Sequence, residues 1–237
     1  DGTESADLSG KDRRVVFVEE EETLPAWVEG KVGSALHFDE SSYAKVEGFY
    51  GIGGTQARTV SMWLKTDWQV PGGATALIGW GFNASGRRWH IKFEASTQSI
   101  RTECQGGQNF GSVPLTDGEW HHVVAIFPEG GTTIGDAIHY IDGEVIDVQG
   151  NGAQSVDTSI DPDEGSVEMT IGMGFLGEAK RFSLVTIDEL AVWERDLNAD
   201  EVQSLFEGAR PINEGDPNLI APSRTSLGQV TAVPPTH

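Results

Sequence analysis

Short apolar stretches separated by turn-forming residues recur along most of this chain. The segments ARTVSMWLKT (57–66), TALIGWGF (75–82) and RRWHIKFEA (87–95) each have the length and apolar content of one strand. Turn-forming residues cluster between such segments, and the 237 residues include 30 Gly. Roughly a dozen segments follow one another about every ten residues, which is typical of sandwiches. The pattern predicts an all-β fold, an antiparallel two-sheet sandwich or jelly roll.

Two local signals add detail. Asp142-Gly143 lies between alternating apolar residues and is the strongest hairpin signal in the chain. Further on, Asn198 and Glu201 form an approximate capping box, and Gly208 ends the helix that they begin. The apolar stripe of this helix consists of Val202, Leu205 and Phe206. We therefore expect one tight hairpin and one short C-terminal helix.

The composition changes after this helix. Residues 210–237 hold five of the chain's 10 prolines. Proline-rich segments of this kind form extended tails or linkers. We expect a jelly-roll domain over residues 1–209 and a Pro-rich extended tail or linker over residues 210–237.

The charge of the chain restricts its partners. Lys and Arg total 16 against 37 Asp and Glu, a formal net charge of -21. Such a surface repels nucleic acid and anionic membranes, and it attracts cations such as calcium. An acidic polysaccharide is a poor partner unless calcium bridges it. No apolar run approaches the roughly 18 residues that span a bilayer, so we expect neither nucleic-acid binding nor membrane insertion.

Two adjacent histidines, His121 and His122, begin the apolar run HHVVAIF. Neighbouring residues of a strand point to opposite faces, so the two imidazoles cannot easily converge on one metal. The other histidines are scattered singly along the chain. We expect this pair to be structural, with one imidazole hydrogen-bonded inside the sandwich.

Five motifs occur in an order that resembles a known family. They are GKVGSALHFDESSYAKV (30–46), ARTVSMWLKT (57–66), DGEWHHVVAIF (117–127), HYIDGEVI (139–146) and TIDELAVWERDLNADEVQSL (186–205). Together they resemble the laminin G-like, concanavalin A-like jelly-roll domain. The resemblance is closest to the bacterial three-part modules appended to secreted enzymes and adhesins. It covers about residues 7–208 and implies a bacterial protein that is extracellular or lies at the cell surface.

The start of the chain departs from the family pattern. In the family, an apolar strand precedes a loop similar to ADLSGKD (6–12), whereas here only residues 1–5 precede it. We expect the missing first strand to lie upstream or to come from a neighbouring chain by strand addition.

The resemblance also implies a structural calcium. Related jelly rolls bind this ion through an aspartate of the last strand, which corresponds to Asp188 in TIDEL. Carbonyls near Gly33 and the loop from Asp7 to Asp12 would complete the site, a mixture of oxygen ligands that calcium tolerates. The alternative is that Asp188 pairs with an arginine or a backbone amide.

Aromatic and polar residues near the middle of the chain are candidates for glycan binding. Aromatic faces stack on sugar rings, and amide or guanidinium groups supply hydrogen bonds. The candidate residues are Trp80, Phe82, Asn83, Trp89, Arg101, Gln105 and Phe110. The alternative for each aromatic ring is a place in the core between the two sheets.

Catalysis is a weaker hypothesis. Jelly-roll glycosidases place carboxylates as Glu-x-Asp-x-x-Glu on one strand, and no such string occurs. IRTEC and WHIKF resemble parts of alginate lyase motifs, but their order differs and no matching Tyr-containing strand follows. A lyase would need a cleft in which Arg101, Glu103 and His90 meet.

We therefore expect a non-catalytic extracellular module, stabilised by calcium, that binds carbohydrate or another surface protein in cell-surface adhesion. The first alternative is a structural module that joins chains of a surface filament or multidomain protein. The second is a polysaccharide lyase or glycoside hydrolase.

Overall fold

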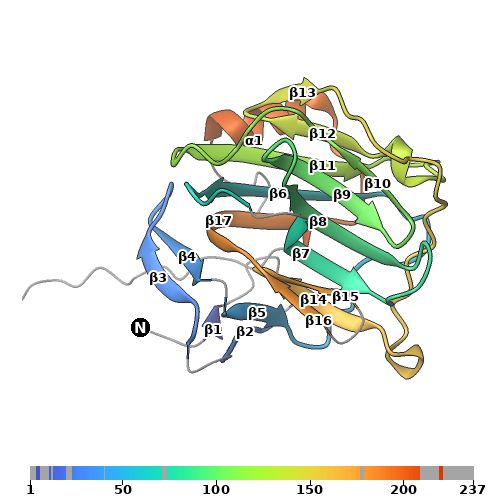
Figure 1. The fold of residues 1–237 in the computed structure, drawn as a ribbon, viewed down its shortest axis with the longest axis horizontal. Helices are drawn as coiled ribbons and strands as arrows, with labels where there is room; N and C mark the ends of the chain where they lie inside the picture. The colour runs from blue at the N-terminus through green and yellow to red at the C-terminus, as the bar shows by residue number, and fades with distance from the viewer. Residues whose placement is uncertain are drawn as a thin grey trace, which may run out of the picture.

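The computed structural model describes residues 4–5, 11, 13–19, 23–39, 41–70, 74–176, 179–208 and 219–220. Two antiparallel sheets lie face to face in this part of the chain (Figure 1). The first sheet has the order β1 (Glu4–Ser5), β2 (Val15–Val18), β5 (Tyr43–Val46), β14 (Val167–Ile171), β7 (Ala74–Gly81), β8 (Arg88–Glu94), β9 (Ser99–Cys104) and β10 (Gly107–Phe110). The prediction of an all-β, two-sheet jelly-roll sandwich is confirmed.

The second sheet is interleaved with the first along the chain. Its order is β13 (Glu144–Ile146), β12 (Ile138–Ile141), β11 (Trp120–Phe127), β6 (Arg58–Lys65), β17 (Leu184–Trp193), β4 (Ser34–Asp39) and β3 (Ala26–Glu29), and β18 (Leu219–Ile220) also pairs with β17. A separate hairpin joins β15 (Met173–Leu176) to β16 (Ala179–Phe182). The described helices are α1 (Ala199–Gly208) and the short 3-10 turns η1 (Ile134–Asp136) and η2 (Pro162–Glu164).

The main core lies between the two sheets. Strand alternation turns Trp89, Ile91 and Phe93 of β8 inward, where they are fully buried with Met62 and Leu64 of β6. Each such side chain contributes about 1.5–3 kcal/mol by leaving water. This packing fixes which face of β8 looks outward.

The second sheet is also covered on its outer face. Helix α1 lies across it, and the ring of Phe206 stacks on Trp63 at 5.8 Å between centroids. Strand β6 is therefore buried on both faces, although Val60, Met62 and Leu64 alternate along the sequence with Ser61, Trp63 and Lys65 in a pattern typical of a half-buried strand. The cause is the helix, which covers Ser61 and Trp63 on the side that the pattern left to solvent.

The predicted helix and hairpin are confirmed. Asn198 Oδ1 accepts from the N–H of Glu201 at 3.0 Å, and Glu201 Oε2 accepts from the N–H of Asn198 at 2.9 Å. This reciprocal pair is the predicted capping box. Between β12 and β13, Asp142 and Gly143 both have positive φ, at 52° and 84°, as a type I′ turn requires.

The two histidines of β11 point to opposite faces, as predicted. His122 is buried, and its Nε2 lies 2.9 Å from Ser61 Oγ beneath helix α1. That position is on the outer face of the second sheet, so the expected location between the sheets is wrong. His121 lies between two carboxylates, 2.8 Å from Asp142 Oδ2 and 3.1 Å from Asp117 Oδ1.

Several expectations concern residues outside the described part. Asp7, Asp12 and, apart from β18, the tail from residue 210 lie there, so the domain boundary stays a prediction. The strand expected upstream or from a neighbouring chain also stays a prediction. Among the described residues, no helix is long and apolar enough to cross a membrane.

The carboxylate clamp on His121 predicts a pH-dependent stability. Burial lowers the pKa of His121, but the hydrogen bonds that its ring donates to Asp142 and Asp117 outweigh burial and raise this pKa above its ordinary value. Protonated His121 is therefore more favourable in the folded state. This stabilisation is complete below the unfolded pKa of about 6.5 and is lost as pH rises through the folded pKa.

We expect wild-type protein to exceed His121→Gln in melting temperature by a few degrees at about pH 5.5 and by less at about pH 8.5. Exposed pairs contribute about 0.2–1 kcal/mol each, and ~1 kcal/mol moves the melting temperature of such a chain by about 2–4 °C. Differential scanning fluorimetry of both proteins across this range measures the gap. A gap that widens with rising pH would contradict the clamp.

Candidate binding face

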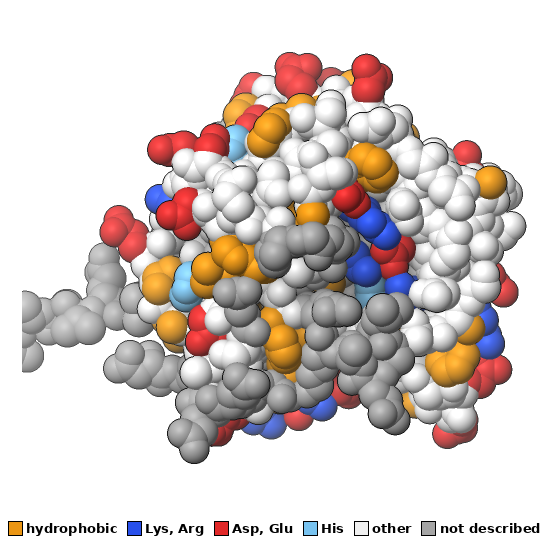
Figure 2. All heavy atoms as spheres, in the orientation of Figure 1, with side chains coloured by type: hydrophobic (Ala, Val, Ile, Leu, Met, Phe, Trp, Pro, Cys, Tyr) orange, Lys and Arg blue, Asp and Glu red, His pale blue; other side chains and the backbone are white. Residues whose placement is uncertain are grey.

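The outer face of strands β8, β9 and β10 carries a group of charged side chains. Residues between the core-facing positions of β8 point outward, and cross-strand pairing places outward residues of β9 and β10 beside them. We call this group the polar face; it consists of Arg88, His90, Lys92 and Glu94 of β8, Arg101 and Glu103 of β9, and Gln108 and Phe110 of β10. Figure 2 looks onto this side of the molecule, where basic and acidic side chains gather in a recess.

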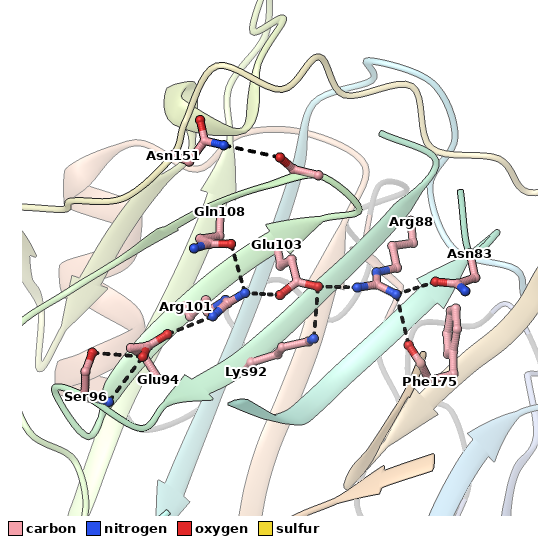
Figure 3. Close-up of polar contacts among 11 residues, drawn as sticks. Asn83, Arg88, Lys92, Glu94, Ser96, Arg101, Glu103, Gln108, Asn151 and Phe175 are labelled. Atoms are coloured by element: carbon pink, nitrogen blue, oxygen red, sulfur yellow. Dashed lines mark hydrogen bonds and ion pairs between the residues drawn. The ribbon is translucent and has the colours of Figure 1, made fainter. Parts of the chain in front are cut away.

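Glu103 stands at the centre of the polar face (Figure 3). Its Oε1 accepts hydrogen bonds from Arg88 Nη2 and from Lys92 Nζ, the latter at 3.0 Å. Its Oε2 accepts from Arg101 Nη2. Three cations from two adjacent strands thus converge on one buried carboxylate.

The network continues on both sides of Glu103. Arg101 Nη1 donates to Glu94 Oε2 at 2.8 Å, and Arg101 Nη2 donates to Gln108 Oε1 at 2.9 Å. Arg88 Nη1 donates to Asn83 Oδ1 at 2.5 Å. A continuous set of hydrogen bonds therefore joins the 82–86 loop to strand β10.

Burial and neighbouring charges shift the pKa values of this network. Burial alone would raise the pKa of Glu103, but Lys92, Arg101 and Arg88 outweigh it and hold this pKa below its ordinary value. Burial lowers the pKa of the Lys92 ammonium to about 8, and the attraction of Glu103 opposes this shift. Both groups are therefore charged at neutral pH.

The polar face has the opposite sign of charge to the chain as a whole. The cations Arg88, Lys92 and Arg101 face the carboxylates Glu94 and Glu103, so three positive charges meet two negative ones. The chain has a formal net charge of -21. One excess positive charge is thus concentrated in a recess of a strongly acidic protein.

The hairpin of β15 and β16 bounds this recess on one side. The ring of Phe175 meets the ring of His90 edge-on at 4.5 Å, and the carbonyl of Phe175 accepts from Arg88 Nη1 at 3.2 Å. His90 is fully buried beneath it. Burial, with Lys92, Arg88 and Arg101, lowers the pKa of His90 well below its ordinary value, so its imidazole is neutral.

Some of the predicted ligand-binding residues lie on or beside this face. Phe110 is half-buried and is the direct cross-strand neighbour of Arg101. Asn83 bonds Arg88, as described above. Gln105 lies in the β9–β10 turn, where its carbonyl accepts from the N–H of Gly86 at 2.7 Å. The half-buried ring of Phe82 lies beneath the Arg87 guanidinium at 5.6 Å, on the rim.

The prediction that Trp80 and Trp89 bind a ligand is wrong. Both rings are fully buried, because they occupy the inward positions of β7 and β8. Trp80 Nε1 donates to the carbonyl of Ile52 at 3.2 Å. Trp89 packs edge-on against Phe127 at 5.6 Å and lies 5.1 Å from the Arg58 guanidinium. The two tryptophans belong to the core between the sheets.

Sequence reasoning missed four members of the polar face: Arg88, Lys92, Glu94 and Gln108. The signal was present, since charged or polar residues alternate with apolar ones along RRWHIKFE. What the sequence did not supply was the register that places Lys92 opposite Arg101 and Gln108 opposite Glu103. His90, Arg101 and Glu103, which the lyase hypothesis required together, do lie on this one face.

Asp188 lies on the second sheet, away from the polar face. Its Oδ2 accepts from the N–H of Val32 at 2.8 Å and its Oδ1 from the N–H of Glu189 at 2.8 Å. Gly33 follows Val32 in the same turn, where the carbonyl of Gly33 accepts from the N–H of Gly30 at 3.0 Å. The predicted neighbourhood of Asp188 and Gly33 is thus present, and so is the alternative pairing with a backbone amide. No group of three or more His, Cys, Asp or Glu that could hold a metal occurs among the described residues.

A pocket of about 290 Å³ lies beside helix α1, on the opposite side of the sandwich. Trp193 and Leu197 line it together with Arg195 and Glu201. Arg195 Nη2 and Nη1 donate to the two oxygens of Glu201 at 2.7 and 2.9 Å, so the charges of this pair are mutually compensated. None of the predicted ligand-binding residues lines this pocket.

Known structures with this fold include carbohydrate-binding and toxin domains. Domain 4 of AbnA, an extracellular arabinanase from Geobacillus stearothermophilus seen with arabinotriose, aligns at a TM-score of 0.58 with 16% identity over 86% of this chain and 97% of that domain. The binding domain of Paraclostridial Mosquitocidal Protein 1 aligns at 0.58 with 17% identity, over 86% of this chain and 49% of that one. The binding domain of botulinum neurotoxin DC, seen with rat synaptotagmin II, aligns at 0.58 with 12% identity, over 88% and 52%.

This chain spans about half the length of the two toxin chains. At these identities the similarity shows the fold alone. No curated protein matches the sequence. A family model does match: Laminin_G_3, described as a concanavalin A-like lectin/glucanases superfamily domain, aligns with residues 38–203. Because that match covers most of the chain and the two-sheet fold agrees with it, the chain belongs to the Laminin_G_3 family of the concanavalin A-like lectin/glucanase superfamily.

Proposed function

We propose that this chain is a non-catalytic, extracellular carbohydrate-binding module and that the polar face is its binding site. One observation carries the proposal: the half-buried ring of Phe110 lies directly beside Arg101 and Gln108 on an outward sheet face. Sugars are held by an aromatic surface combined with a few fixed hydrogen-bonding groups. Lys92 and Glu94 of the neighbouring strand β8 add a further hydrogen-bond donor and acceptor.

The state of the charged groups favours binding over catalysis. Glu103 accepts hydrogen bonds from three cations, which lower its pKa and leave it a weak base. A general acid needs the opposite shift, as in glycosidases. His90 is fully buried against Phe175 and cannot touch a substrate without movement of the hairpin. The ion pairs of Glu103 and the burial of His90 therefore suit a structural or ligand-binding role better than acid–base catalysis.

Two similar structures support the class of partner. The AbnA domain was seen with arabinotriose, and its parent arabinanase is extracellular. The botulinum domain was seen with synaptotagmin, which is a protein partner. A glycan is favoured here because the polar face combines an aromatic ring with a dense set of polar groups. If no glycan binds, the alternatives are adhesion through a surface protein and assembly of chains.

Removing the aromatic ring from the polar face should abolish most glycan binding. We expect affinity gel electrophoresis on a panel of plant and bacterial polysaccharides to show retardation of the wild-type protein by at least one of them. Phe110→Ala should weaken that binding about ten- to a hundredfold, since burial of a phenylalanine contributes about 1.5–3 kcal/mol. Incubation with the same polysaccharide should release neither reducing ends nor unsaturated products.

Trp120→Ala is the matched control, because Trp120 is a half-buried aromatic residue at the start of β11 on the other sheet. It should leave retardation unchanged. Equal loss in both variants, or no retardation by any polysaccharide, would contradict glycan binding at the polar face. Product release would contradict its non-catalytic nature.

Calcium remains part of the proposal as a stabilising ion. Asp188 of β17 accepts from the N–H of Val32, which precedes Gly33 in the 30–33 turn, and the Asp188 carboxylate and the Gly33 carbonyl are oxygen donors that suit calcium. The ion would add a charge that joins this turn to the last strand. We expect calcium at about 1 mM to raise the melting temperature of chelator-treated protein by several degrees through binding to the folded state. Magnesium at the same concentration serves as the control, and an unchanged melting temperature with calcium would remove the ion from the account.

A further inference from the structure

The polar face has more hydrogen-bond donors than its own carboxylates satisfy. Arg88 Nε and Arg101 Nε are buried and find no acceptor among the described residues. Both ring nitrogens of His90 also lack a partner there, but this buried ring lies against Phe175, out of reach of a ligand. Buried polar atoms are nearly always hydrogen-bonded, so unpaired donors on one face indicate acceptor oxygens that the described residues do not supply.

The charge of the face indicates what those oxygens carry. Three cations meet two carboxylates, and each carboxylate is already held by at least one cation. Lys92 donates to Glu103 with one of three available N–H groups. Mutual repulsion from Arg88 and Arg101 contributes to the lowered pKa of Lys92. An additional anion would relieve this repulsion, whereas a neutral group would not.

The geometry selects the position of that anion. Lys92 and Arg101 are direct cross-strand partners and point to the same side of the sheet. Their side chains retain 9% and 16% of their surface, against 2% for Arg88. Phe110 lies on the other side of Arg101. The two less deeply buried cations and the aromatic ring therefore form one row across β8, β9 and β10.

We infer that the polar face takes an acidic saccharide, with the carboxylate or sulfate of one sugar residue between Lys92 and Arg101 and a sugar ring against Phe110. This inference rests on the proposed glycan-binding function and names its ligand class. It differs from the expectation, based on overall charge, that an acidic polysaccharide is a poor partner unless calcium bridges it. The net charge of the chain acts at long range and is screened by salt within about 8–10 Å, whereas recognition depends on the local excess of positive charge.

The test compares acidic glycans with neutral forms of the same backbone. Oligogalacturonate is measured beside its methyl ester to probe carboxylates, and dextran sulfate beside dextran to probe sulfates. We expect isothermal titration calorimetry to show at least tenfold tighter binding of one acidic form than of its neutral counterpart. That binding should weaken severalfold between about 50 and about 500 mM NaCl, because it depends on charge.

Lys92→Met keeps the aliphatic stem and leaves Glu103 paired with Arg88 and Arg101, so the variant should fold. It should lose at least tenfold in affinity for the acidic form. Lys45→Met is the matched control, because Lys45 also faces outward from this sheet and pairs with a glutamate, Glu168, at 2.7 Å. It should bind as the wild type does.

The outcomes separate this inference from the proposed function. Equal binding of acidic and neutral forms, or equal loss in the Lys92 and Lys45 variants, would overturn the acidic ligand and leave glycan binding standing. If neither acidic probe binds but a neutral polysaccharide of the panel retards the protein, the acidic ligand is likewise overturned and glycan binding stands. If no glycan of either kind binds, the proposed function fails as well.

Discussion

The convergence of three cations on the carboxylate of Glu103 is the interaction on which the polar face depends. Arg88, Lys92 and Arg101 come from two adjacent strands and are mostly buried, so each would be costly without a counter-charge. Removing one partner from a buried ion pair typically costs about 3–5 kcal/mol. The same carboxylate fixes the rotamers of the cations. A rigid arrangement of donors at an outward face is what selective recognition of a polar ligand requires.

The fold accommodates this charged cluster because the two faces of each strand have different roles. The inward residues of β8, among them Trp89 and Phe93, fill the core, while the outward residues carry charge. On the second sheet the division is different, since helix α1 covers the outer face and buries Trp63 and His122. The first sheet instead presents a charged recess beside the half-buried ring of Phe110.

Local features of the fold could be predicted from the sequence, because short-range chemistry determines them. The capping box of Asn198 and Glu201 and the turn at Asp142 need only neighbouring residues, and both predictions are confirmed. The binding face required long-range information. Trp80 was assigned to ligand binding although it is in the core, and Lys92 was missed, because their roles depend on sheet register and on which face meets the second sheet.

The central claim is that ligand binds on the outer face of β8, β9 and β10. The most direct measurement is a titration of the ¹⁵N-labelled protein with a glycan that binds it. Amide chemical shifts in heteronuclear NMR spectra report which residues the glycan affects. The account predicts the largest shifts within residues 88–110, with Arg101, Gln108 and Phe110 among them, and small shifts along β11. Largest shifts around Trp193 and helix α1 would place the ligand in the pocket on the other sheet and contradict the account.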